Sequence, residues 1–189
     1  MIRKSETKEP GLMTALKCGT IKPGLVMAGL LICLLIGCSD NMPLKIGHTV
    51  QDFRLQTLDH GRFYLNQQKG NLVLLVFFST YCTYCKQELI ELKELARKYP
   101  PGQFTLAAVC TDPQNMDELR GMRNDLDITC PILLDDKGKL FQQFGFRGLP
   151  TTLVIDPQGR AALIRMGYNA HILKQIRDHI DIIFNKGAA

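Results

Sequence analysis

The chain has 189 residues, a length that fits about one domain, and its 46% hydrophobic and 22% charged residues are ordinary for a protein with one core. The formal net charge is +5, of which +3 lies ahead of Cys38 and only +2 after it. So small and scattered a charge excludes a nucleic-acid-binding surface. The seven cysteines do not form the even, regularly spaced framework of a disulfide-stapled secreted domain.

The N-terminal region contains an uncharged apolar run, residues 24–37. As a helix these 14 residues span about 21 Å, less than the roughly 30 Å hydrocarbon core, which favours a secretory signal. The sequence Leu-Ile-Gly-Cys that ends at Cys38 resembles the bacterial lipobox. The resemblance implies a lipoprotein signal peptide over residues 1–37, lipidation of Cys38, and a location in the bacterial cell envelope, outside the cytoplasmic membrane. An uncleaved anchor with a chance cysteine is the alternative.

Residues 38–47 are a predicted tether, and residues 48–186 a predicted folded domain. The continuous apolar run over 72–78 is typical of a strand covered on both faces. The predicted elements, in chain order, are a hairpin over 52–65, a strand over 72–78, a helix over 86–99 that Pro100 stops, a strand over 104–109, a helix over 117–126, an extended piece over 131–134, a helix over 139–144, strands over 151–155 and 161–165, and a helix over 171–184. This order predicts an α/β domain with a central mixed sheet, helices on both faces and an N-terminal β-hairpin.

The pair Cys82 and Cys85, separated by Thr83 and Tyr84, carries the clearest chemical signal. It follows the buried strand directly and opens the next helix, where free backbone N–H groups and the helix dipole stabilise a thiolate. The offset of three residues brings both sulfurs within bonding reach. We therefore predict a redox-active disulfide in which Cys82 is the attacking thiol and Cys85 the more buried, resolving thiol.

Several motifs resemble the thioredoxin superfamily, and in particular its membrane-tethered TlpA- and ResA-like branch, which is related to the AhpC/TSA proteins. They are Asp52-Phe53, the Cys-x-x-Cys pair with its preceding strand, and the segment Gly-Leu-Pro-Thr-Thr over 148–152. The resemblance implies a thioredoxin-like three-layer sandwich and a cis peptide bond at Leu149-Pro150, facing the cysteines. Tyr81 stands where the family usually has Trp, which we interpret as tuning of the site.

Glu88 occupies a position, three residues after Cys85, where this branch often carries a glutamate. A carboxyl near the buried thiol could transfer its proton, whereas an ordinary first-turn glutamate stabilised by the helix dipole is the alternative. Cys110 and Cys130 are interpreted as packed thiols rather than as a second disulfide or redox relay. The four histidines show no metal-ligand spacing, so we expect no metal and no cofactor.

The function implied by the resemblance is a monomeric thiol–disulfide oxidoreductase that reduces disulfides of exported proteins, with apocytochrome c as one candidate substrate. A membrane electron donor of the DsbD/CcdA kind would supply the electrons, and the lipid anchor would hold the enzyme at the membrane. The alternatives are a disulfide oxidase, a thiol peroxidase, a copper-delivery lipoprotein and a non-catalytic lipoprotein. The proline that the peroxidase site needs ahead of its cysteine is absent, and the Cys-x-x-Cys spacing is one residue short for the copper proteins.

Overall fold

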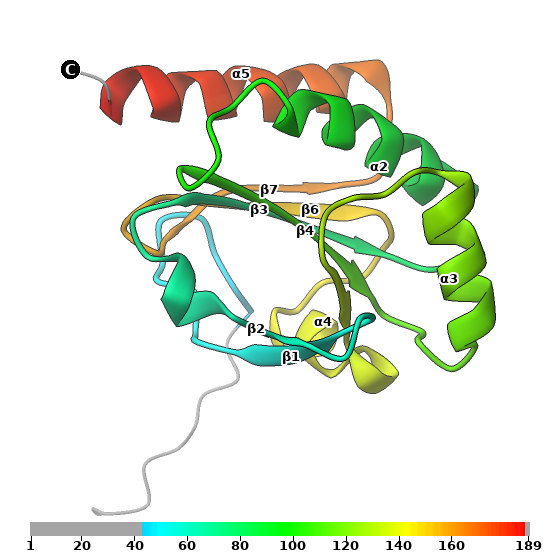
Figure 1. Cartoon of the computed structure of the whole chain (residues 1–189). Helices are drawn as coiled ribbons and strands as arrows, with labels where there is room; N and C mark the ends of the chain where they lie inside the picture. Colours follow the sequence, from blue (N-terminus) through cyan, green and yellow to red (C-terminus); the bar gives the residue numbers. More distant parts are fainter. Residues whose placement is uncertain (1–42, 188–189) are drawn as a thin grey trace, which may run out of the picture. The chain divides into compact units, whose positions relative to one another are not determined.

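The computed structural model describes residues 43–187 and centres on one seven-stranded sheet with the order β2-β1-β5-β4-β3-β6-β7 (Figure 1). Strands β3, β4 and β5 are parallel to one another, and every other pairing is antiparallel. The sheet is therefore mixed, as predicted. The strands are β1 (Arg54–Thr57), β2 (Arg62–Tyr64), β3 (Leu72–Phe78), β4 (Phe104–Cys110), β5 (Ile132–Leu134), β6 (Thr151–Ile155) and β7 (Ala161–Met166).

Helices cover both faces of this sheet (Figure 1). They are η1 (Leu65–Gln68), α2 (Thr83–Ala96), α3 (Met116–Asp125), η2 (Asp136–Gly138), α4 (Lys139–Gln143) and α5 (Ala170–Gly187). The predicted helix after the cysteine pair ends at Ala96 rather than at Tyr99, because tight turns bonded to Leu95 and Ala96 follow it.

Strand β3 shows how the sequence builds the two cores, since all seven of its residues are buried. Successive side chains of a strand point to opposite faces. Leu74 and its alternate neighbours pack with residues of α2, α3 and α5, whereas Leu75 and its alternate neighbours pack with residues of α4 and of the N-terminal hairpin. The result is the thioredoxin-like arrangement of three layers, with β3 inside it.

The described part of the predicted tether, residues 43–47, is bonded to the domain. The backbone N–H of Leu44 donates to the Phe144 carbonyl at 3.0 Å, and that of Gly47 donates to the Ala161 carbonyl at 2.8 Å. Packed structure therefore begins ahead of residue 48. The predicted signal peptide and Cys38 lie outside the described residues. Over residues 43–187, no helix has both the length and the apolar character needed to cross a membrane.

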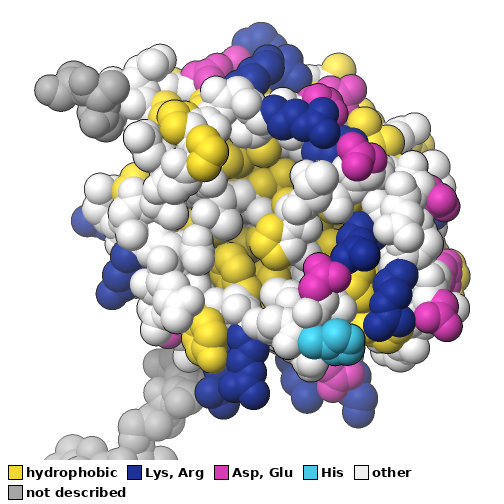
Figure 2. Space-filling view, viewed as in Figure 1, with side chains coloured by type: hydrophobic (Ala, Val, Ile, Leu, Met, Phe, Trp, Pro, Cys, Tyr) yellow, Lys and Arg dark blue, Asp and Glu magenta, His cyan; other side chains and the backbone are white. Residues whose placement is uncertain are grey.

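Charged side chains lie around the edge of the face seen in Figure 1, as Figure 2 shows. Lys, Arg, Asp and Glu crowd the side of the molecule where α3 lies, and apolar side chains show in the middle of the same face. On α3 the buried residues are Leu119 and Met122, so its remaining surface is free to carry charge. The helix therefore presents a polar outer surface beside the end of β3, where the cysteine pair lies.

Candidate functional site

The cysteine pair lies where β3 gives way to α2. Cys82 is the N-cap of α2, and its sulfur accepts the backbone N–H of Cys85 at 3.1 Å. The two residues form a disulfide with 5.2 Å between their Cα atoms. Cys82 is partly exposed and Cys85 is fully buried. An incoming thiol or disulfide can thus reach the outer sulfur, and the helix N-terminus favours its thiolate form.

The loop before β6 lies beside the same end of β3, because β6 pairs with β3 and Phe77 stands opposite Thr151. The Leu149-Pro150 peptide bond is cis, which confirms the expectation drawn from the resemblance. The Pro150 carbonyl accepts the backbone N–H of Gly167 at 2.7 Å. Leu149 is half-buried and packs against both cores, so the loop is held on each side of the sheet.

Glu88 is buried, with 1% of its surface exposed, and lies one turn after Cys85 on the same helix. One carboxyl oxygen accepts the Thr152 hydroxyl at 3.0 Å, and the other finds no hydrogen-bond partner among the described residues. Burial raises the pKa of Glu88 to about 7, although the Thr152 hydrogen bond acts in the opposite direction. Glu88 is therefore a buried rather than a solvated carboxyl, and its role in proton transfer stays a prediction.

Two tyrosines and a threonine form the exposed surface next to Cys82. Tyr81 is 75% exposed and Tyr84 63% exposed, and Thr83 is exposed as well. Interaction with the nearby carboxylate of Glu118 on α3 raises the pKa of Tyr81. The residue that replaces the family's usual Trp is thus largely exposed to solvent, near a carboxylate of α3.

Cys110 and Cys130 are free thiols in the structure. Cys110 ends β4 opposite Leu134, the last residue of β5, whereas Cys130 precedes the start of β5. The two therefore lie at opposite ends of β5. Burial raises the pKa of Cys110 to about 12 and that of Cys130 to about 11.

Asp112 belongs to the surroundings of the site and was not found by sequence reasoning. Its carboxylate accepts hydrogen bonds from Ser79 and Thr80, the two residues that follow β3. The available signal was its place two residues after the strand that ends at Cys110, because parallel strands bring their carboxyl ends to the same edge of a sheet.

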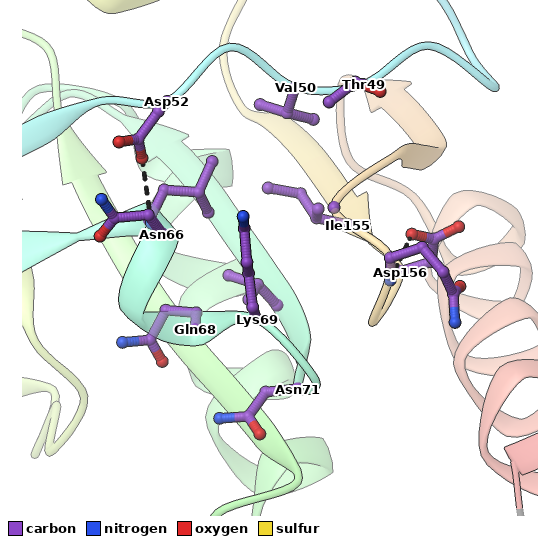
Figure 3. A pocket seen from close by; sticks show the side chains of 13 residues that line it. Thr49, Val50, Asp52, Asn66, Gln68, Lys69, Asn71, Ile155 and Asp156 are labelled. Carbon is purple, nitrogen blue, oxygen red and sulfur yellow. Dashed lines mark hydrogen bonds between the residues drawn. The ribbon is translucent and has the colours of Figure 1, made fainter.

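A cavity of roughly 370 Å³ lies near the opposite end of β3 from the cysteines, lined in part by Val73 and Ile155 (Figure 3). The Lys69 side chain points into it, and at its rim the Asp52 carboxylate accepts the Asn66 N–H at 3.0 Å. The cavity is separate from the cysteine pair. Within residues 43–187, no cluster of three or more His, Cys, Asp or Glu side chains is arranged to hold a metal ion.

The fold and the accessible cysteine pair together define a thiol–disulfide oxidoreductase with a thioredoxin fold. The AhpC/TSA family model matches residues 46–163, more than half of the chain, and the protein belongs to that family.

Among similar proteins, the thioredoxin-like protein YneN of Bacillus subtilis is 28% identical over 152 residues, covering 75% of this chain and 89% of the relative. The thiol-disulfide oxidoreductase ResA of Geobacillus thermodenitrificans is 26% identical over 145 residues, covering 77% of this chain and 82% of the relative.

Two solved structures have the same fold. A thiol:disulfide interchange protein of the thioredoxin family from Chlorobium tepidum superposes with a TM-score of 0.63 at 18% identity, covering 77% of this chain and 99% of its own. StoA from Bacillus subtilis gives 0.58 at 22% identity, covering 70% and 99%.

Proposed function

We propose that this oxidoreductase works as a reductase of disulfides in exported proteins, tethered to a membrane of the bacterial cell envelope by a lipid on Cys38. The observation that carries the exchange chemistry is the arrangement of the pair, with Cys82 accessible at a helix N-terminus and Cys85 buried behind it. The lipobox-like sequence ending at Cys38 supports the tether. Resemblance to the TlpA- and ResA-like branch supports the direction of electron flow.

Reduction of a substrate proceeds in two exchanges at this pair. The Cys82 thiolate attacks one sulfur of the substrate disulfide, and the other substrate sulfur leaves as a thiolate. Cys85 then loses its proton and attacks the Cys82 sulfur, which releases the second substrate thiol and forms the 82–85 disulfide. Glu88 is a candidate acceptor for the Cys85 proton, because it lies on the same buried face of α2 and has a pKa of about 7.

The substrates that this surface suits are protein disulfides, with the haem-attachment cysteines of apocytochrome c as one candidate. Cys82 is flanked by exposed aromatic side chains, Tyr81 and Tyr84, which suit contact with an extended chain. A membrane electron donor of the DsbD/CcdA kind would then return the 82–85 disulfide to the dithiol.

Equilibration of the purified domain with glutathione or dithiothreitol buffers tests the direction. We expect a reduction potential near that of thioredoxin, about −270 mV, which favours donation of electrons. A value near about −120 mV, typical of a strong oxidant, would overturn the reductase and favour a disulfide oxidase.

Trapping tests the substrate class in cells. We expect Cys85→Ala to accumulate mixed disulfides between Cys82 and exported proteins, because the resolving thiol is gone. Cys82→Ala is the matched control and should trap nothing. Equal trapping by both variants would contradict the assignment of Cys82 as the attacking sulfur.

Tethering has its own test. Cys38→Ala should abolish incorporation of a labelled fatty acid and release the protein from the membrane fraction. Retention of the label in that variant would show that Cys38 is not the lipidated residue.

A further inference from the structure

The short turn between β3 and the cysteine pair, residues 79–81, is held by one carboxylate. The Ser79 hydroxyl donates to Oδ2 of Asp112 at 2.7 Å. The Thr80 backbone N–H donates to Oδ1 at 3.3 Å, and the Thr80 hydroxyl donates to Oδ2 at 3.4 Å. Two successive residues of the turn are thus bonded to the same side chain.

These contacts continue to the attacking cysteine through the backbone. The Ser79 hydroxyl oxygen accepts the N–H of Tyr81 at 3.2 Å, and the Ser79 carbonyl accepts the N–H of Cys82 at 3.1 Å. Ser79 therefore links the Asp112 carboxylate to the backbone that begins α2. The position of the Cys82 sulfur depends on this turn, since Cys82 is the N-cap of that helix.

Asp112 itself is well fixed. The preceding residue, Thr111, donates both its N–H and its hydroxyl to the Phe78 carbonyl, at 3.0 and 3.1 Å, which closes the ends of β3 and β4. The thiol of Cys110 donates to Oδ1 of Asp112 at 3.3 Å. Thr80 is only 3% exposed, so without Asp112 its polar groups would be left buried and unpaired.

We propose that Asp112 is a positioning residue for Cys82. It holds the 79–81 turn so that the Cys82 and Cys85 sulfurs stay within bonding distance of each other. The inference deepens the exchange activity of the 82–85 pair and rests on it. A fixed turn keeps the Cys82 thiol close to the Cys85 thiol. Their effective concentration relative to each other is then high, which stabilises the disulfide.

The test is the equilibrium of the full-length protein with glutathione. In this reaction the dithiol gives two electrons and two protons to glutathione disulfide and forms the 82–85 disulfide and two molecules of glutathione. Asp112→Asn keeps the shape of the side chain but removes its charge and one acceptor oxygen. We expect the equilibrium to shift about tenfold toward the dithiol, which corresponds to about 30 mV.

Two further variants separate positioning from a general loss of stability. Ser79→Ala keeps the charge and removes the 2.7 Å contact, so we expect a smaller shift in the same direction, about threefold. Asp117→Asn is the matched control, because Asp117 is exposed and its ion pair is with Arg120, on the same helix. It should leave the equilibrium unchanged.

An Asp112→Asn equilibrium equal to that of Asp117→Asn, with only the melting temperature lowered, would overturn the inference, and so would a shift toward the disulfide. If Asp112→Asn does not fold, Ser79→Ala alone decides by the same criterion. A wild-type pair that fails to exchange with glutathione would instead refute the exchange activity itself, so the two failures are distinguishable.

Discussion

The four cysteines of the folded domain lie in two regions that give the same side chain opposite properties. Cys82 and Cys85 occupy the N-terminus of α2, where the outer sulfur meets solvent and helix N–H groups. Cys110 and Cys130 lie at β4 and ahead of β5, where burial raises their thiol pKa values to about 12 and about 11. Thiolate chemistry is therefore confined to the helix terminus.

Distance from the site does not explain this difference. The Cys110 thiol donates to the same Asp112 carboxylate that holds Ser79, so Cys110 lies beside the turn that precedes the pair. Its sulfur is buried in the core on the α2 side of the sheet and next to a carboxylate, and both features favour the protonated thiol. A cysteine near an exchange site thus becomes reactive only if its own surroundings stabilise the thiolate.

The largest expected difference in activity is between two variants, each of which lacks one cysteine from one of the two regions. Cys82→Ser should abolish reduction of a protein disulfide, because the serine hydroxyl does not replace the thiolate as a nucleophile. Cys130→Ser should leave the rate within about twofold, since that thiol is not a thiolate near neutral pH. A turbidity assay with insulin measures both. Loss of activity in Cys130→Ser with an unchanged melting temperature would break the comparison by making Cys130 part of the redox path.

Alkylation of the fully reduced protein sharpens the same comparison without any substitution. At pH 8 iodoacetamide should modify Cys82 at least about a hundredfold faster than Cys110 or Cys130, because only thiolates react and the two buried thiols are protonated at that pH. Mass spectrometry of timed samples gives each rate. Comparable rates at Cys82 and Cys110 would show that burial does not control reactivity here.

The sequence predicts local features of this site better than those that depend on distant segments. The apolar run at 72–78 and the Cys-x-x-Cys spacing sufficed for β3 and for the cap of α2, because both are local. The burial of Glu88 depends on how α2 packs over β6, the strand from which Thr152 donates a hydrogen bond to the Glu88 carboxyl. Helical periodicity alone does not supply that geometry. The role of Asp112 depends in the same way on the pairing of β3 with β4.

Glu88 extends the comparison to a carboxyl group, because burial raises its pKa as it raises the pKa values of Cys110 and Cys130. Its pKa of about 7 in the folded, disulfide form exceeds the ordinary 4.5, so the folded state binds this proton more tightly than the unfolded state does. The proton's stabilisation is fully present below pH 4.5 and is lost as the pH rises through about 7. Relative to Glu88→Gln, the wild-type free energy of unfolding should fall by up to about 3 kcal/mol between pH 4.5 and 8.

Urea unfolding of the oxidised proteins at several pH values measures this difference. In the reduced enzyme, the same substitution should remove a rise in the exchange rate near pH 7 if Glu88 accepts the Cys85 proton. Parallel stability curves for wild type and Glu88→Gln would contradict the raised pKa. If the stability difference depends on pH as expected but the pH profile of the exchange rate is unchanged, Glu88 is buried and titrates but does not accept the Cys85 proton.

The smallest expected effect concerns the Thr152 hydrogen bond, which lowers the pKa of Glu88 whereas burial raises it. The Thr152 hydroxyl donates to the carboxyl at 3.0 Å and so favours its ionised form. Thr152→Val keeps the branched shape on β6 but removes this donor, and we expect the pH midpoint of the stability difference to rise by about half a unit. In a Glu88→Gln background the same change should move no midpoint. A midpoint that also shifts in that background would show that a group other than Glu88 titrates there. Glu88 would then not be a carboxyl whose pKa burial raises.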